Sequence, residues 1–307
     1  MVLSVCIPVY NSDVKVLVLA ISKQIAINNF PVEIIVLDDA SSPDIELINR
    51  DALAEITNTR YFSLPENIGR SAIRNRFIDL AYGDFVLFID GDSHVIREDF
   101  IGHYLQTIQL NSGDLIFGGS VYQNERPPRD KYLRWKYSIC RESKSAAART
   151  RSLYGFKTNN FCVKKAVLED YPFDERIKGY GHEDTLFGFV LLQNKLKIVH
   201  IENPVLNTCL DTNSIFLEKT KQSIQNLWFI HEEIQPNIDF INHVRLLKTY
   251  YNVKKYRAIP LLRFVNYFFG RLNERLLKSG WFTLRMFDFY KLAMLVNWID
   301  KKDKFQK

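Results

Sequence analysis

The sequence predicts an α/β fold in which helices flank a mostly parallel sheet, followed by a helical extension. Short apolar runs alternate with helix-like periodicity through the first 210 residues, as in repeated βα units. Two of these runs end abruptly in paired carboxylates, and the pattern is helical from Asn213 onward. We therefore predict one domain over residues 1–210, with halves 1–92 and 93–210, and a helical extension over residues 211–307.

The first half contains the clearest elements. Residues 3–9 and 33–37 are apolar strand candidates, and residues 13–26 place apolar side chains on one helix face. Pro43 suits the first turn of the next helix. The remaining expected elements are a strand at 60–64, a helix at 70–81 and a strand at 85–89.

After residue 92 the alternation becomes less regular. We expect a helix at 98–110, a strand at 115–122, an ordered segment at 161–168, a helix at 182–192 and a strand at 196–201. Residues 123–152 are polar and basic and contain Pro127-Pro128, so we expect a mobile loop or an insertion there.

Composition excludes several classes of protein. The chain has 307 residues, 47% of them hydrophobic and 25% charged, which is ordinary for a globular protein. Its four cysteines are widely scattered, which argues against a zinc site or a disulfide framework and favours a reducing compartment. The N-terminal segment is typical of a first strand rather than a signal peptide, and no apolar run is long enough for a spanning helix.

The positive charge is concentrated near the C-terminus. Net charge is +6, but residues 254–307 contain 13 Lys or Arg against 4 Asp or Glu. The remainder of the chain is therefore mildly acidic, which argues against a nucleic-acid groove in the main domain.

Asp90-Gly91-Asp92 follows the apolar run 86–89. Open α/β sheets bind ligands at the carboxyl ends of their strands, and carboxylates together with phosphate oxygens bind Mg²⁺ or Mn²⁺. The alternative is a turn with two exposed carboxylates, in which His94 is an ordinary loop residue.

Two further segments contain groups that suit a nucleotide. Asp38 and Asp39 end another strand and could contact a ribose or base, or merely cap the next helix. Arg70 and Arg74 share a helix face and could bind phosphate, or belong to a solvated basic face.

Glu183 and Asp184 open a helix after the glycine-rich segment 179–181. Acidic residues in a first turn suit the helix dipole, and a carboxylate at the lip of a cleft could also act as a general base.

Taken in order, these motifs resemble those of the family 2 glycosyltransferases, which have the GT-A fold. The segments that carry the resemblance are 4–11, 38–41, 67–75, 90–92, 173–184 and 200–204. The resemblance does not cover the chain after about residue 210.

The resemblance implies a role for each matching residue. Pro8, Tyr10 and Asp39 would line the base and ribose pocket of a nucleotide sugar, with Arg74 and Asp90 also on the donor side. Asp92 would bind Mn²⁺ or Mg²⁺ directly. Asp184 would be the general base, with Glu183 beside it. His200 would contact the metal or the diphosphate, unless it is simply a structural histidine on an apolar strand.

The resemblance implies inverting transfer of a sugar from a nucleotide-diphosphate sugar, with a UDP-sugar favoured. The expected acceptor is a glycan or lipid-linked glycan in cell-surface polysaccharide assembly. Two alternatives are a nucleotidyltransferase and a non-catalytic nucleotide-binding scaffold. The first would normally have a glycine-rich loop after the first strand, where this chain has Pro8-Val9-Tyr10-Asn11.

Residues 256–299 interleave aromatic and basic side chains. Such helices lie in membrane interfaces, so we expect a cytoplasmic protein that is peripheral on the inner face of the membrane and contacts anionic lipid. The alternative is a helix pair packed on the catalytic domain with a basic outer face.

Overall fold

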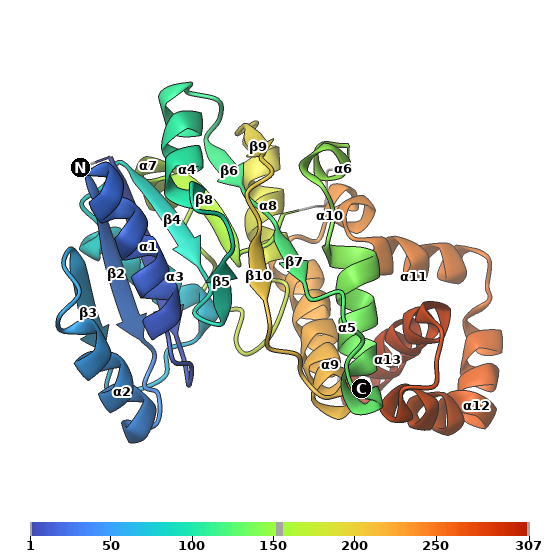
Figure 1. Cartoon of the computed structure of the whole chain (residues 1–307). Coiled ribbons are helices and arrows are strands. Elements are labelled where there is room, and N and C mark those ends of the chain that lie inside the picture. Colours follow the sequence, from blue (N-terminus) through green and yellow to red (C-terminus); the bar gives the residue numbers. More distant parts are fainter. Residues whose placement is uncertain (1, 152–155, 306–307) are drawn as a thin grey trace. The chain divides into compact units, whose positions relative to one another are not determined.

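The computed structural model describes residues 2–151 and 156–305, which form two compact units (Figure 1). The first unit comprises Met1–Gln123, Glu142–Lys178 and Glu183–Cys209. The second comprises Asn124–Arg141, Gly179–His182 and Leu210–Lys307. The second unit therefore includes two short segments from the region that precedes residue 210.

A seven-stranded sheet forms the centre of the first unit. Its strand order is β3-β2-β1-β4-β8-β6-β9. Only β8 runs antiparallel to its neighbours, so the carboxyl ends of the other six strands share one edge. The mostly parallel sheet is confirmed. The strand bounds are β1 (Leu3–Val9), β2 (Val32–Asp38), β3 (Thr59–Ser63), β4 (Phe85–Ile89), β6 (Leu115–Phe117), β8 (Asn160–Lys164) and β9 (Ile198–His200).

Both faces of this sheet are covered by helices. Alternate residues of β1 divide between two cores, with Val5 and Ile7 on one face and Cys6 on the other. Helices α1 (Lys15–Asn28), α2 (Pro43–Leu53) and α4 (Phe100–Gln109) contribute to the first core. Helices α3 (Arg70–Leu80), α7 (Lys165–Asp170) and α8 (Glu183–Gln193) contribute to the second. Pro43 begins α2, as its position in the sequence predicts.

The single strand expected at 115–122 is wrong, because the chain divides there into β6 and β7 (Ser120–Tyr122). β7 belongs to a separate three-stranded sheet, β5-β10-β7, with β5 (Ser93–Val95) and β10 (Val205–Asn207). Gly118 and Gly119 make the break, and Gly119 has a φ of +87°. The Arg149 guanidinium lies in this break and donates to the carbonyls of Gly118 (3.0 Å) and Ile201 (2.6 Å).

The mobile loop expected at 123–152 is also wrong for the residues that the structure describes; residue 152 lies outside them. The segment forms a 3₁₀ turn (Arg129–Lys131), α5 (Tyr132–Tyr137), a π-helical turn (Ser138–Glu142) and α6 (Ala146–Thr150). Leu133 of α5 is fully buried in the core of the second unit. Ser145 caps α6 by accepting a hydrogen bond from the Ala148 amide. Burial of Leu133, Ser138 and Arg149, together with the Ser145 cap, helps to order a segment whose composition is mostly polar.

The second unit is helical. Its core includes Leu217, Leu277 and Phe287, from three different helices. In the part of the chain that is described, no helix is both long and apolar enough to cross a membrane. The remaining helices are α9 (Asn213–Phe229), a π-helical turn (Ile230–Ile234), α10 (Ile238–His243), α11 (Arg245–Lys255), α12 (Ile259–Ser279) and α13 (Leu284–Phe305).

The break at Gly119 predicts a large effect of a small substitution. A Cβ at this position would lie 2.2 Å from Arg149 Nη1, on a backbone that L residues rarely adopt. We expect Gly119→Ala to lower the free energy of unfolding by about 2–4 kcal/mol. In Gly102→Ala, the matched control on α4, the new Cβ has no neighbour closer than Phe30 at 3.6 Å. The free energy of unfolding of that variant should equal that of the native chain or exceed it by about 1 kcal/mol. Urea denaturation measures both, and equal midpoints would contradict the packing argument.

Candidate functional site

The loops after β1 and β2 are tied together at the carboxyl edge of the sheet. The Asn11 amide donates to Ser41 Oγ (2.7 Å), and the Asn11 side chain accepts from the Ser42 amide (2.8 Å). Asn11 itself has a φ of +52°. Pro8 is half-buried at the end of β1, whereas the Tyr10 ring is 58% exposed. An exposed ring on a fixed loop can stack on a planar ligand.

The two carboxylates at the end of β2, Asp38 and Asp39, have different local partners. Asp38 is fully buried and accepts from the Ser41 amide (2.7 Å) and the Tyr61 hydroxyl (3.0 Å). Asp39 accepts from the amides of Ile68 (2.7 Å) and Gly69 (3.0 Å). Burial raises the pKa of Asp39, and these two amides partly oppose the shift. Asp38 therefore organises the turn before α2, and Asp39 anchors the loop that enters α3.

Arg74 and Asp90 form an ion pair between α3 and the end of β4. Arg74 Nη2 lies 2.9 Å from Asp90 Oδ1, and Nη1 donates to the Arg70 carbonyl (3.0 Å). The Arg74 side chain is almost fully buried, while Asp90 is partly exposed. Arg74 thus contacts a carboxylate of its own chain. Arg70 is more exposed than Arg74, and its Nη1 lies 3.6 Å from Glu183 Oε1.

Asp92 lies on the solvent side of the turn after β4. A Cβ on the buried Gly91 would lie 3.0 Å from Val14 Cγ1 and 3.3 Å from the Pro8 carbonyl, so glycine lets this turn pack on β1. Asp92 is exposed, and the chain then enters β5.

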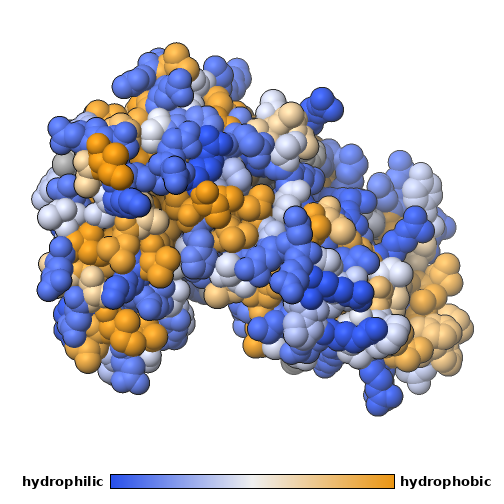
Figure 2. Space-filling model, viewed as in Figure 1, coloured by the Kyte–Doolittle hydropathy of each residue, from blue (hydrophilic) through white to orange (hydrophobic). Residues whose placement is uncertain are grey.

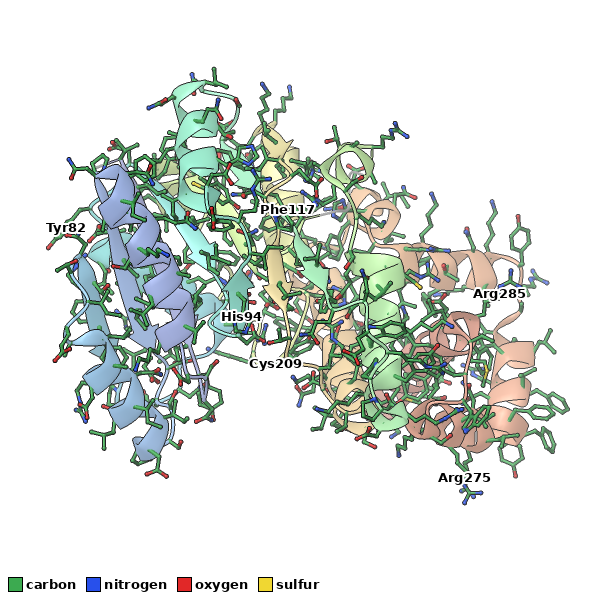
Figure 3. All side chains as sticks on the ribbon, viewed as in Figure 1. Tyr82, His94, Phe117, Cys209, Arg275 and Arg285 are labelled. Carbon is green, nitrogen blue, oxygen red and sulfur yellow. The ribbon has the colours of Figure 1, made fainter. Side chains whose placement is uncertain are left out.

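Asn207 of β10 is the neighbour of this turn that the sequence did not indicate. Its Oδ1 accepts from Ser93 Oγ (3.0 Å), the residue that follows Asp92. β10 has only three residues, too few for a periodicity signal. His94 lies on β5 rather than in the expected loop, with Nε2 3.1 Å from Thr208 Oγ1 (Figure 3).

The oxygen atoms around Asp92 suit a hard divalent cation that is bound partly by the protein and partly by the phosphates of a substrate. In residues 2–151 and 156–305, no three His, Cys, Asp or Glu side chains are grouped so as to hold a metal alone. Mg²⁺ and Mn²⁺ are commonly held by one or two carboxylates, with substrate phosphates and water completing the shell. The exposed Asp92 carboxylate fits such a site.

His200 is not brought to Asp92. It ends β9, and β8 and β6 lie between β9 and β4, which corresponds to about 14 Å at the usual strand spacing. Burial, with a smaller contribution from the Arg149 charge, lowers the pKa of His200 to about 4. Its ring centroid lies 5.7 Å from that of Phe117. The geometry gives no support to the predicted metal contact of His200.

Asp184 lies in the first turn of α8 beside the buried Glu183. Its Oδ1 accepts from the Thr185 amide (2.6 Å) and the Thr185 hydroxyl (3.2 Å). Burial, together with the negative charge of Glu183, raises the pKa of Asp184 to about 6. The Lys157 ammonium and the Thr185 hydrogen bonds oppose this rise. Asp184 is thus a carboxylate that can exchange a proton near neutral pH.

A second group missed by the sequence analysis lies near Asp184. Lys157 forms an ion pair with Glu142 Oε1, and Glu142 Oε2 accepts from the Tyr122 hydroxyl (2.9 Å). Tyr122 lies opposite Asn207 in the small sheet. The Lys157–Glu142 pair is therefore tied to Tyr122, on the strand next to the one that holds Asn207. Glu142 lies in the segment predicted to be a loop, which hid this connection.

Comparison with known proteins places the chain in a family. The model of the family described as glycosyl transferase family 2 matches residues 4–173. The chain belongs to glycosyl transferase family 2. Its relatives include the amylovoran biosynthesis glycosyltransferase AmsB of Erwinia amylovora, which is 28% identical over 66% of this chain and 68% of AmsB. The GalNAc(5)-diNAcBac-PP-undecaprenol beta-1,3-glucosyltransferase of Campylobacter jejuni is 27% identical, over 60% of this chain and 58% of that enzyme.

Solved structures of low sequence identity have the same fold. The mannosyltransferase PcManGT from Pyrobaculum calidifontis, in complex with GDP-Man and Mn²⁺, superposes with a TM-score of 0.59 at 13% identity, covering 97% of this chain and 86% of that one. S. aureus TarS 1-349 in complex with UDP-GlcNAc gives 0.51 at 18% identity, with coverage of 98% and 92%. This glycosyltransferase has the GT-A fold.

The environment of Asp184 predicts a measurable titration. Its carboxylate should protonate as the pH falls through about 6, because burial and Glu183 both disfavour the charged form. Removing the opposing cation in Lys157→Met should raise the pKa of Asp184 further. Carboxyl ¹³C NMR titration measures this pKa. Lys164→Met is the matched control, because Lys164 pairs with Asp114 (2.8 Å) and should shift only that carboxyl. An Asp184 pKa near 4 would contradict the argument.

Proposed function

We propose that this family 2 glycosyltransferase transfers a sugar from a nucleotide-diphosphate sugar to an acceptor hydroxyl, with inversion at the anomeric carbon. The observation that carries the proposal is that two carboxylates of the first unit lie in different environments. Asp92 is an exposed carboxylate in the turn after β4, and Asp184 is a carboxylate with a raised pKa. A metal ligand and a general base need these two environments.

The donor nucleotide would bind at the edge formed by the loops after β1 and β2. Tyr10 offers an exposed ring to the base, next to Pro8. Asp39 holds the amides of Ile68 and Gly69 and so fixes the wall of the pocket. A UDP-sugar is our first candidate, supported by the UDP-GlcNAc complex of the structurally similar TarS. Arg74 would act by holding Asp90 in place, since it is paired with Asp90.

Asp92 would hold Mn²⁺ or Mg²⁺ against the donor diphosphate. When bound, the cation offsets the charge that develops on the leaving nucleoside diphosphate. The Mn²⁺ in the PcManGT structure supports this assignment. Asp90, fixed by Arg74, would orient the ribose side of the donor.

Asp184 would remove the proton from the acceptor hydroxyl. The activated oxygen forms its bond to the anomeric carbon as the bond to the nucleoside diphosphate breaks, and this single displacement inverts the configuration. Glu183 raises the pKa of the base by its charge, and the Lys157 ammonium limits that rise. A base with a pKa near 6 is ionised at neutral pH yet still accepts a proton readily.

The acceptor would be a glycan carried by a lipid, at the inner face of the cytoplasmic membrane. The names of the AmsB and Campylobacter jejuni relatives, one in amylovoran biosynthesis and one acting on an undecaprenol-linked glycan, support this choice. Hexosyl or N-acetylhexosaminyl transfer would both suit the same carboxylates. Membership of the transferase family disfavours the nucleotidyltransferase alternative. A non-catalytic scaffold is distinguished by the assays below.

Donor use is the first test. We expect the protein to release nucleoside diphosphate from one member of a panel of UDP-, GDP- and dTDP-sugars when Mn²⁺ or Mg²⁺ is present, and chelation should abolish release. Asp92→Ala should remove this metal-dependent reaction. Asp99→Asn changes an exposed carboxylate paired with Arg97 and is the control that should stay active. Nucleotide binding without turnover across the panel would identify a scaffold.

The base assignment has its own test. Asp184→Asn should lower kcat by about 10²–10⁴-fold, the usual contribution of a general base, with donor affinity nearly unchanged. In the native protein, kcat should fall as the pH drops through about 6, because protonated Asp184 cannot accept the hydroxyl proton. Stopped assays over pH 5–8 measure this limb. Near-native turnover by Asp184→Asn would overturn the assignment.

A further inference from the structure

Helix α12 presents most of its side chains to solvent. Only Asn273 and Leu277 of its 21 residues are buried, and Leu277 lies in the core of the second unit. Most large apolar side chains on α12 are therefore not used for packing within the described chain. The most exposed of them are Leu261 (64%), Phe264 (61%), Tyr267 (81%), Phe268 (59%), Phe269 (57%) and Leu272 (53%).

These residues are arranged on one side of the helix together with arginines. Phe264 and Phe268 are one turn apart, and Arg271 and Arg275 continue the same stripe at spacings of three and four. Leu261 lies on this stripe one turn before Phe264. The stripe thus changes from apolar and aromatic at its N-terminal end to basic at its C-terminal end. Figure 2 shows hydrophobic side chains on the outer surface of α12, and Figure 3 shows Arg275 extending away from the helices.

The structure divides the basic aromatic segment of the sequence into two parts. Phe287 and Leu277 belong to the core, so those positions are not available to a partner. The α12 stripe, defined here as Leu261, Phe264, Phe268, Arg271 and Arg275, is exposed. α13 therefore packs within the helical unit through Phe287, and this packing does not account for the exposed side of α12.

The basic residues of the stripe differ from their neighbours. Arg263 forms an ion pair with Asp300, and Lys278 with Glu274 (2.9 Å), so these two charges are balanced within the unit. Among the side chains that the structure describes, in residues 2–151 and 156–302, neither Arg271 nor Arg275 has an ion-pair partner. Their charge is directed outward beside exposed aromatic rings.

We propose that the α12 stripe is the surface by which the protein docks on an anionic lipid bilayer. Leu261, Phe264 and Phe268 would enter the boundary between headgroups and acyl chains, and Arg271 and Arg275 would contact lipid phosphates. Aromatic and aliphatic groups beside arginines are the chemistry that such an interface recognises. Each arginine near an anionic surface adds to the electrostatic attraction. The inference rests on the proposed membrane location but not on the donor chemistry.

A second copy of the chain is the competing occupant of this surface. Self-association through the same stripe would enclose four arginines at an interface with no acidic counterpart on the stripe, and unpaired charges at an interface are unfavourable. An anionic membrane would cover the apolar half of the stripe with acyl chains and pair the arginine half with lipid phosphates. The anionic membrane is therefore the partner proposed for the stripe, and the experiment below also detects a dimer.

The test is flotation of the purified full chain with vesicles of phosphatidylcholine alone, or with 30% phosphatidylglycerol. We expect binding only to the anionic vesicles, weakened by added salt. Phe264→Glu/Phe268→Glu and Arg271→Glu/Arg275→Glu should each reduce binding at least tenfold. Ile27→Glu/Leu110→Glu changes two exposed apolar residues of the first unit and should bind like the native chain.

Two further measurements separate the outcomes. Circular dichroism and nucleotide-sugar turnover without vesicles show whether the variants fold and whether the donor chemistry holds. Native turnover without flotation, or flotation unaffected by the α12 substitutions, would overturn the docking inference and leave the transferase proposal standing. A dimer in light scattering that Phe264→Glu/Phe268→Glu dissociates, in a protein that does not float, would assign the stripe to a second copy.

Discussion

The architecture of the first unit depends on the burial of both faces of its central sheet. Alternate side chains of β1, β2 and β4 enter two separate hydrophobic cores, so neither face can hold a polar group that needs water. Polar residues with a chemical role are consequently confined to the ends of the strands. Because β8 alone runs antiparallel, one edge collects the loops after β1, β2 and β4. The candidate donor site is a consequence of this arrangement.

At that edge, carboxylates of similar sequence context acquire different properties. Asp38 is buried and organises a turn, whereas Asp39 binds two amides at the start of α3. Asp90 is fixed by Arg74, and Asp92, two residues later, is exposed. Access to solvent, rather than residue type, separates the structural carboxylates from the one proposed to bind a cation.

The second unit uses its hydrophobic residues in two ways. Phe287 and Leu277 build a core that also takes Leu133 from the α5 segment, while α12 keeps a row of large apolar side chains at its surface. Exposing so many aromatic groups is unfavourable in water unless a partner covers them. The same composition thus supplies both the core of a helical unit and the surface proposed to dock on a membrane.

The sequence alone determined the alternation of strands and helices, because a period of two or 3.6 residues is a local property. It also placed the strand-end carboxylates and the acidic first turn of α8. Tertiary structure decided the rest. The division of 115–122 between two sheets depends on Arg149 filling a break 30 residues away, and the order at 129–150 depends on burial of Leu133 by distant helices. The pairing of Arg74 with Asp90, the distance of His200 from Asp92 and the exposure of α12 likewise arise from contacts between residues far apart in the chain, which no local pattern records.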